Sequence, residues 1–394
     1  MLSLRRSLLV SGHLLLGTSM LIATLASGQP SASDEHGFPP LQTDVMVPDL
    51  NAIESGPAGT APAGYATLPS GPAVDTPSRP IAPAIVQGPP EPIAPPPVDH
   101  LRVSLDWYPS PRHAALYVAQ ARDMFRHRGL RVEIATPADP EVPAKLLADS
   151  RVDLALTRQP LLHLLVDEGL PLIRVASLVS VPLDALIVSR ESGIESLSQL
   201  EGKRIGHADR DGEQILLPAM LAGAKLTLDD LDTPNVHYRL EEAVREGRVD
   251  GVIGGNRHLL PRSLANDGTA TRSFPIEDHG VPLHDGLILV ANREELRQRR
   301  DAIRRFIAAL EEATAWILEH PRDSWQLLIA TEPTLDTPVN RDAWPEIRAR
   351  LTLTPSALSQ GRYHAFEHFL EEQGLAEGQH KVSRLAVDIS APAP

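Results

Sequence analysis

Polar and aromatic side chains stand at the ends of several apolar segments that the sequence predicts to be strands. The first group is Asp106, Trp107 and Tyr108, which end the apolar run at 101–107, with His113 shortly after them. Aromatic rings offer flat faces for stacking, while a carboxylate and an imidazole offer hydrogen bonds. This group therefore predicts a binding surface for a flat, polar molecule.

Other predicted strand ends repeat this arrangement. Arg158 and Gln159 follow the run at 152–156, Glu213 follows 203–208, Asn256 follows 249–255, and Asp285 precedes 286–292. Ligands in open α/β sheets bind outside the carboxyl ends of the strands, so we expect these side chains to line one cleft. The alternative for any single residue is structural, with Trp107 closing a core or His113 beginning a helix. The repetition favours a shared binding site.

The composition sets limits on the class of protein. The chain has 394 residues, and 42% of them are hydrophobic, which predicts two lobes with additional segments. The net charge is −14 at pH 7, and we find no basic stripe in the sequence, so nucleic acid is not an expected partner. The chain has no cysteine, which excludes disulfides, thiolate nucleophiles, cysteine-ligated metals and a lipid-modified N-terminal cysteine.

The first 28 residues have the features of a signal peptide. Arg5 and Arg6 supply positive charge, 8–25 is mostly apolar, and 26–28 offers small residues for cleavage. We therefore expect export and a periplasmic location. Sec or Tat export stays open, as does an uncleaved membrane anchor.

A linker and a folded module are predicted after the signal peptide. Residues 29–98 are rich in proline and alanine and end in "PPEPIAPPPVDH". Such a segment cannot bury enough apolar surface to offset its ordering entropy, so we expect a disordered tether. The predicted substrate-binding domain is 99–375, and 376–394 is a C-terminal tail.

Short apolar runs alternate with helical patterns in the predicted domain. The expected strands are 101–107, 131–136, 152–156, 173–179, 185–189, 203–208, 236–240, 249–255 and 286–292, and the expected helices include 112–128, 141–149, 159–168 and 297–319. This alternation predicts an α/β fold with parallel strands. We expect two α/β lobes with a ligand cleft between them, lobe 1 at about 99–185 and 290–375 and lobe 2 at about 186–289.

Long segments of the chain resemble one known family. They are "LDWYPSPRHAALYVAQARDMFRHRGLRVEIATPADP", "VDLALTRQPLLHLLVDEGLPLIRVASLVSVPLDALIV", "LEGKRIG", "EDHGVPLHDGLILVANREEL" and "EEATAWILEHP". They are similar, over about 101–351, to the thiamine-pyrimidine family within the SsuA/thiamine-synthase-like superfamily. This family includes ThiY-like periplasmic substrate-binding proteins of ABC importers and the fungal thiamine-pyrimidine synthases.

The resemblance implies a type II periplasmic binding protein fold and a ligand from thiamine biosynthesis. A formylated aminomethylpyrimidine is an example of such a small heterocyclic ligand. The expected partner is an ABC permease subunit in the inner membrane, and we expect a monomer. An aminopyrimidine suits the candidate residues, because Trp107 and Tyr108 supply faces while Asp106, Gln159, Glu213 and Asn256 supply polar edges.

The resemblance also raises an enzymatic alternative. The fungal synthases hold pyridoxal phosphate on a lysine, with a histidine donor and a cysteine-rich loop nearby. The matching strand end here is Thr157-Arg158-Gln159, no lysine lies between Lys145 and Lys203, and the loop is replaced by 279–285. Without the lysine His163 has no Schiff base to serve. We therefore expect no cofactor and no catalytic residues.

Other functions stay open on the sequence alone. His364 and His368 are four residues apart on a predicted helix, but the pattern lacks the H-E-x-x-H order, so we expect no metal site. Flavin and sulfonate ligands stay open, since Arg158 and Arg257 are compatible with an anionic group. A ligand sensor that uses the same cleft is a further alternative.

Overall fold

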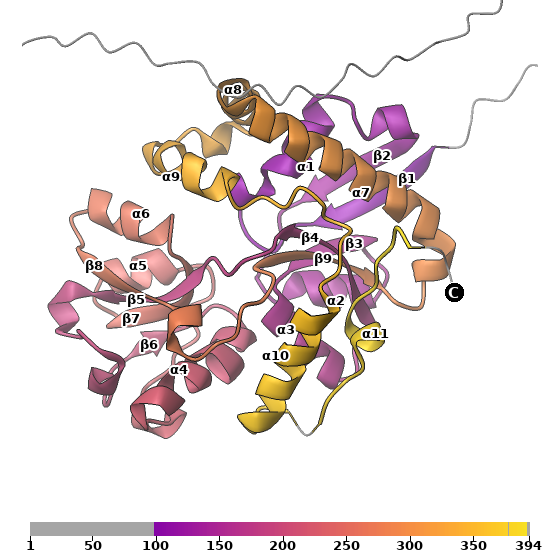
Figure 1. The fold of residues 1–394 in the computed structure, drawn as a ribbon. Coiled ribbons are helices and arrows are strands. Elements are labelled where there is room, and N and C mark those ends of the chain that lie inside the picture. Colours follow the sequence, from indigo (N-terminus) through magenta and orange to yellow (C-terminus); the bar gives the residue numbers. More distant parts are fainter. Residues whose placement is uncertain (1–97, 377, 392–394) are drawn as a thin grey trace, which may run out of the picture. The chain divides into compact units, whose positions relative to one another are not determined.

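The computed structural model describes residues 98–376 and 378–391 (Figure 1). The predicted signal peptide and all but the last residue of the predicted linker lie outside the described residues. Among the residues that are described, no helix is both long and apolar enough to cross a membrane.

Two separate sheets organise the described residues. Sheet A has the strand order β2 (Leu130–Ala135), β1 (Asp99–Ser104), β3 (Leu154–Thr157), β9 (Leu287–Asn292) and β4 (Leu172–Val179). The first three strands are parallel, and β9 lies antiparallel between β3 and β4. Sheet A is therefore mixed, and not parallel throughout as the alternating pattern predicts.

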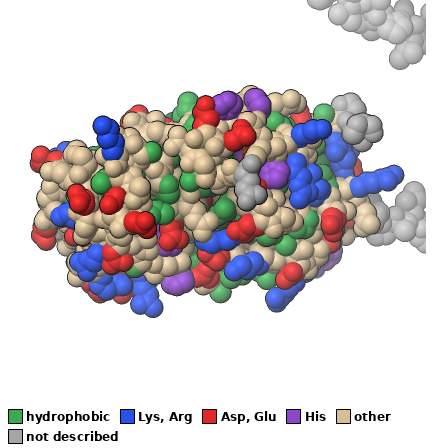
Figure 2. Space-filling view, turned by 90° about the horizontal axis from the view of Figure 1, so that it is seen from below, with side chains coloured by type: hydrophobic (Ala, Val, Ile, Leu, Met, Phe, Trp, Pro, Cys, Tyr) green, Lys and Arg blue, Asp and Glu red, His purple; other side chains and the backbone are tan. Residues whose placement is uncertain are grey.

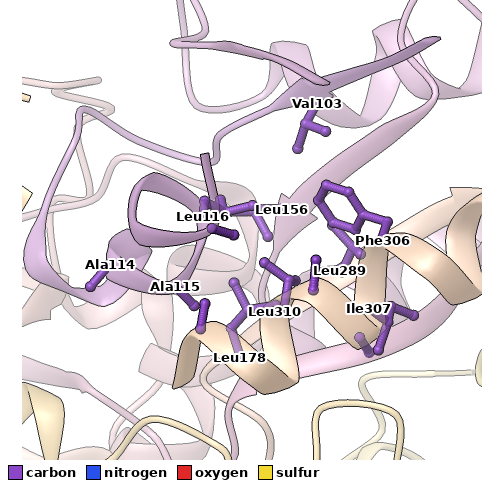
Figure 3. Close-up of a cluster of buried hydrophobic side chains, with 14 of the residues drawn as sticks. Val103, Ala114, Ala115, Leu116, Leu156, Leu178, Leu289, Phe306, Ile307 and Leu310 are labelled. Atoms are coloured by element: carbon purple, nitrogen blue, oxygen red, sulfur yellow. The ribbon is translucent and has the colours of Figure 1, made fainter. Parts of the chain in front are cut away.

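Alternating residues of the strands of sheet A face two helical layers. One layer comprises α1 (Ala114–Ala121), α7 (Leu296–Glu319) and α8 (Pro321–Thr331), with α9 (Pro338–Arg348) alongside. Leu156 and Leu289 belong to the same hydrophobic core as Phe306 and Leu310 of α7, which Figure 3 shows. The other layer comprises α2 (Val142–Ala148), α3 (Gln159–Asp167) and α11 (Val382–Leu385). The two-residue period of a strand explains why both faces of sheet A are buried.

Sheet B is built from an uninterrupted part of the chain. Its order is β6 (Ile205–Gly206), β7 (Gly251–Asn256), β5 (Asp184–Ser189) and β8 (Thr271–Pro275). The helices α4 (Leu217–Ala224), α5 (Leu240–Arg245) and α6 (Leu260–Asn266) cover it (Figure 1). The chain leaves sheet A after Val179 and returns to it at Leu287, so sheet B lies between these two passages in the sequence.

Short helical turns connect the larger elements. They are 3₁₀ turns at Pro111–His113, Arg126–Arg128, Arg190–Ser192, Leu197–Gln199, Leu228–Asp230, Ile276–His279 and Pro333–Leu335, and a π-helical turn at Gly212–Leu216. The predicted helix at 112–128 is divided by these turns, because α1 ends at Ala121, with Arg122 as its C-cap, well before the turn that begins at Arg126. Asp123 adopts a positive φ of 57°, which stops the helix.

Helix α10 (Gln360–Glu372) packs against both groups of elements. Its Tyr363 belongs to the hydrophobic cluster around α2 and α3, whereas Phe366, Phe369 and Leu370 belong to the cluster beneath sheet B. Figure 1 shows α10 running beside α3. The C-terminal part of the chain therefore braces the two lobes and does not belong to one lobe alone.

The predicted strand at 236–240 is wrong. Asn235 makes only an isolated bridge to His207, His237 has a positive φ of 50°, and Leu240 begins α5. The β-branched and aromatic residues there suit a strand locally. The left-handed residue breaks the extended backbone and turns the chain into a loop.

Candidate ligand-binding site

A cavity of about 490 Å³ lies between elements of the two sheets, and three aromatic rings line it. The ring of Tyr238 meets Trp107 edge-on, with ring centroids 4.6 Å apart and an interplanar angle of 88°, and it lies 4.5 Å from Tyr108. The Tyr238 hydroxyl donates to the carbonyl of Pro137 at 3.1 Å. These contacts bring a loop of lobe 2 against the end of β1 and form an aromatic wall.

Asp106 is held by two neighbours from its own loop. Its carboxylate lies 2.9 Å from Arg112 and 3.0 Å from His113 Nε2. The backbone N–H of Ser110 donates to His113 Nδ1 at 3.2 Å, so Nε2 carries the proton that His113 donates to Asp106. Burial lowers the pKa of His113 and keeps it neutral. Burial opposes ionisation of Asp106, but Arg112 and His113 outweigh it and hold the pKa of Asp106 well below its usual range.

Arg158 connects the end of β3 to carboxylates of lobe 2. It donates through Nε and Nη2 to Asp211 at 3.1 and 2.6 Å and through Nη2 to Asp209 at 2.5 Å, and its Nε lies 3.7 Å from Asp184. Burial would lower the pKa of Arg158, but the three carboxylates raise it well above its usual value. Burial raises the pKa of Asp209 to about 6, against the effect of Arg158. The guanidinium of Arg158 is thus paired with carboxylates of the protein.

A smaller cavity of about 250 Å³ lies on the other side of Arg158. Asp106 and Arg158 line it together with apolar residues of α3 and with Lys145 and Arg210 at its charged side. Arg210 makes a bidentate pair with Glu168, with distances of 2.6 and 3.0 Å. This pair joins the loop after β6 to the end of α3 across the two lobes.

Several predicted site residues do line the larger cavity. These are Trp107, Tyr108, Arg158 and Asn256. Asp106 lines the smaller cavity, and His113 is fully buried behind it. Whether these residues bind a ligand stays a prediction.

The structure places Gln159, Glu213 and Asp285 away from both cavities. Gln159 is fully buried, where it accepts from the backbone N–H of Asp285 at 2.9 Å and lies 3.2 Å from His163. Asp285 accepts hydrogen bonds from Ser177, Arg362 and Tyr363.

Through these hydrogen bonds, Gln159 and Asp285 connect the segment before β9 to α3 and α10. Glu213 is half-buried, 3.7 Å from His207 Nε2, and accepts from Thr233 at 3.4 Å.

Several residues of the site are not indicated by the sequence. Arg112 lies between Pro111 and His113, in a segment predicted only as a helix start. Tyr238 lies within the wrongly predicted strand. Asp184, Asp209 and Asp211 pair with residues more distant in sequence, so no local spacing indicates them.

No group of three or more metal-ligating side chains occurs among the described residues. His368 lies 3.2 Å from Glu372 on an exposed face of α10. On the face drawn in Figure 2, acidic and basic side chains are interspersed.

Two sheets with a cavity between them define the class to which the fold belongs, that of the periplasmic binding proteins. The structure matches the alkanesulfonate-binding protein SsuA from Xanthomonas axonopodis pv. citri bound to MOPS with a TM-score of 0.59 and 18% identity, over 74% of this chain and 99% of that one. The predicted fold class is confirmed.

The chain belongs to the NMT1/THI5-like family, whose model matches residues 110–324. It is 38% identical over 292 residues to a Haemophilus influenzae protein named for thiamine biosynthesis, covering 74% of this chain and 92% of that one. It is 28% identical to a formylaminopyrimidine-binding protein of Halalkalibacterium halodurans, over 63% and 76%. It is 26% identical to the 4-amino-5-hydroxymethyl-2-methylpyrimidine phosphate synthase of Aspergillus parasiticus, over 62% and 74%.

Proposed function

We propose that this chain is an extracytoplasmic solute-binding protein that delivers an aminopyrimidine of the thiamine-precursor type to an ABC permease. The observation that carries the proposal is the 490 Å³ cavity between the lobes, with the rings of Trp107, Tyr108 and Tyr238 on its wall. A cavity of this size and aromatic lining suits a small heterocycle. The relative named for formylaminopyrimidine binding supports the same ligand class.

The charges around the cavity favour a heterocycle over a sulfonate. A sulfonate is bound by several N–H donors or cationic groups, and these must not already be paired with carboxylates of the protein. Arg112 is paired with Asp106, and Arg158 is paired with Asp209 and Asp211. Both arginines of the cavity are therefore already neutralised, which supports a ligand without a strong negative charge.

A pyrimidine-synthase-like enzyme is the second candidate, favoured by the family relatives named as synthases. Lys145 lines the smaller cavity, but its Nζ lies 3.3 Å from Glu141 and its side chain is mostly exposed. The end of β3 carries Arg158, whose guanidinium forms no Schiff base. These features support a binding protein over an enzyme that holds pyridoxal phosphate on a lysine.

Calorimetry with the full chain tests the proposal. We expect saturable binding of 4-amino-5-hydroxymethyl-2-methylpyrimidine or of the formylated aminomethylpyrimidine, and no binding of an alkanesulfonate or of riboflavin. Binding of the sulfonate or flavin without the pyrimidines contradicts the proposed ligand class. Mixing the protein with pyridoxal phosphate is the control for the enzyme, and a Schiff-base absorbance lost on Lys145→Ala favours the synthase.

A further inference from the structure

Two polar side chains face each other across β5 and β7 at the larger cavity. Asp184 and Asn256 are paired residues in the antiparallel register of these strands, and both line the cavity. Paired residues of an antiparallel ladder project to the same face of the sheet. A carboxylate and an amide therefore lie side by side on the wall of the cavity.

Asp184 has unused capacity to accept hydrogen bonds. Its side chain is only 3% exposed, and its ion-pair contact with Arg158 is longer than a hydrogen bond. The nearest cation is Arg158, with Nε at 3.7 Å, and that guanidinium is bound to Asp209 and Asp211. Burial raises the pKa of Asp184, although the charges of Arg158 and Arg112 oppose this effect. A buried carboxylate with so little compensation is costly unless a ligand supplies donors.

Asn256 has the complementary unused group. Its Oδ1 accepts from the backbone N–H of His258 at 2.9 Å, which fixes the orientation of the amide. Its Nδ2 is buried and has no hydrogen-bond partner among the described residues. A buried N–H group without a partner is unusual in a native protein. Asn256 therefore offers a donor next to the acceptor of Asp184.

We propose that Asp184 and Asn256 recognise the edge of the ligand at which an exocyclic amine stands beside a ring nitrogen. This inference rests on the proposed function and names the group that selects among pyrimidines. A 4-aminopyrimidine presents an N–H donor beside a ring-nitrogen acceptor, which matches the carboxylate and the Nδ2 donor. A 4-oxopyrimidine presents the reverse order, an oxygen acceptor beside a ring N–H, which places acceptor against acceptor and donor against donor.

The pair thus determines specificity by penalising the wrong ligand as well as by binding the right one. A site built to hydrogen-bond a ligand leaves its buried polar groups unpaired when the analogue arrives. Asp184 lies on the first strand after the chain enters sheet B, and Asn256 ends β7. Both positions are fixed by the ladder of sheet B, so the edge is recognised by a rigid element.

The test measures the ratio of affinities for a 4-aminopyrimidine and for its 4-oxo counterpart by competition calorimetry. We expect the wild type to prefer the amine, and Asp184→Asn to reduce this preference about tenfold to hundredfold, the range of one charge-assisted hydrogen bond. The double variant Asp184→Asn, Asn256→Asp exchanges acceptor and donor, and we expect it to prefer the 4-oxo ligand. Asp250→Asn makes the same chemical change at the other end of β7 and should leave the ratio unchanged.

The outcomes separate this inference from the proposed function. Wild-type protein that binds neither pyrimidine overturns the proposed function itself. Wild-type protein that prefers the amine, with a ratio that neither Asp184→Asn nor Asn256→Asp alters, overturns the edge recognition while the function stands. The melting temperature of each variant without ligand verifies that it is folded, and either single variant suffices for the comparison of ratios.

Discussion

Individual residues of the cleft divide into those that the protein satisfies and those that it leaves available. Arg112 and His113 both pair with Asp106, although Arg112 Nε has no hydrogen-bond partner among the described residues, and Arg158 is surrounded by carboxylates of lobe 2. Buried charges of this kind are retained because removing one partner leaves the other uncompensated. The aromatic rings, Asp184 and Asn256 remain for a ligand.

The sequence indicates residue types at strand ends, but it does not indicate how each side chain is used. Gln159 and Asp285 follow the same pattern as Asn256, yet they bond to each other in the interior. The difference arises because Asp285 precedes its strand, so it joins the passage between sheets beside α3. Nothing in the local spacing distinguishes these two cases.

Trp107 provides a prediction about affinity. We expect Trp107→Ala to weaken binding of the pyrimidine about tenfold to hundredfold, because stacking on a heterocycle is worth about 1–3 kcal/mol. The ligand-induced change in tryptophan emission should disappear in this variant. Calorimetry and fluorescence on the same samples measure both effects.

Trp316→Ala is the matched control, since Trp316 is also partly buried but stacks on His320 away from the cavity. This variant should keep both affinity and emission change. A Trp107→Ala protein that melts far lower yet binds normally indicates a core residue, because such truncations in a packed interior cost about 3–5 kcal/mol.

Asp209 provides a prediction about pH. Its folded pKa of about 6 lies above the ordinary value of 3.8, so the native state binds this proton more tightly than the unfolded state does. The stability that the proton contributes is present at low pH and is lost as the pH rises through about 6. We expect the free energy of unfolding of Asp209→Asn, relative to wild type, to increase from about pH 4 to about pH 7. Denaturant titrations at several pH values across this range measure this difference in the free energy of unfolding. If the free energies of wild type and variant change in parallel with pH, the prediction is wrong.

At the scale of elements, periodicity predicts most of the fold. The predicted strands at 173–179 and 286–292 match β4 and β9 closely, and 297–319 matches α7. These segments are buried on both faces or carry a clear apolar stripe, so hydrophobic pattern and secondary structure agree. The strand direction in sheet A is not available from such patterns, because it depends on the route of the chain through sheet B.

The loop before α5 shows why the site itself is harder to predict. His237 adopts a left-handed conformation and lies 2.9 Å from Asp139 of lobe 1. Tyr238 follows it and is directed onto Trp107. Backbone strain of this kind occurs where surrounding structure imposes it. A tertiary contact thus overrides the local β-propensity that led to the wrong strand.

At the scale of the whole described module, ion pairs join the lobes. Arg158 with Asp209 is buried, and Arg210 with Glu168 is partly exposed. Exposed pairs contribute little to equilibrium stability and weaken with salt. We therefore expect the pair of Arg210 and Glu168 to affect the rate at which the two lobes open more than it affects the affinity for the ligand.

We expect Arg210→Ala to accelerate both association and dissociation of the ligand, because opening precedes entry and release. The affinity should change less than about tenfold, since a partly exposed pair contributes about 0–1 kcal/mol. Stopped-flow fluorescence at low and high salt measures the rates. Arg245→Ala removes a comparable pair with Asp267 inside lobe 2 and should leave them unchanged. Unaltered rates in Arg210→Ala contradict this role.

The position of β9 has a consequence for the order in which the chain folds. This strand separates β3 from β4 in sheet A, yet it is made only after all of sheet B. Until residues 287–292 are available, sheet A consists of two separate parts, the strands β2, β1 and β3 and the single strand β4. By contrast, β5 to β8 already have all their partner strands in sheet B. Contacts distant in sequence form slowly because loop closure precedes them. Lobe 2 should acquire protection from hydrogen exchange first, and insertion of β9 should be the late step that completes the cleft.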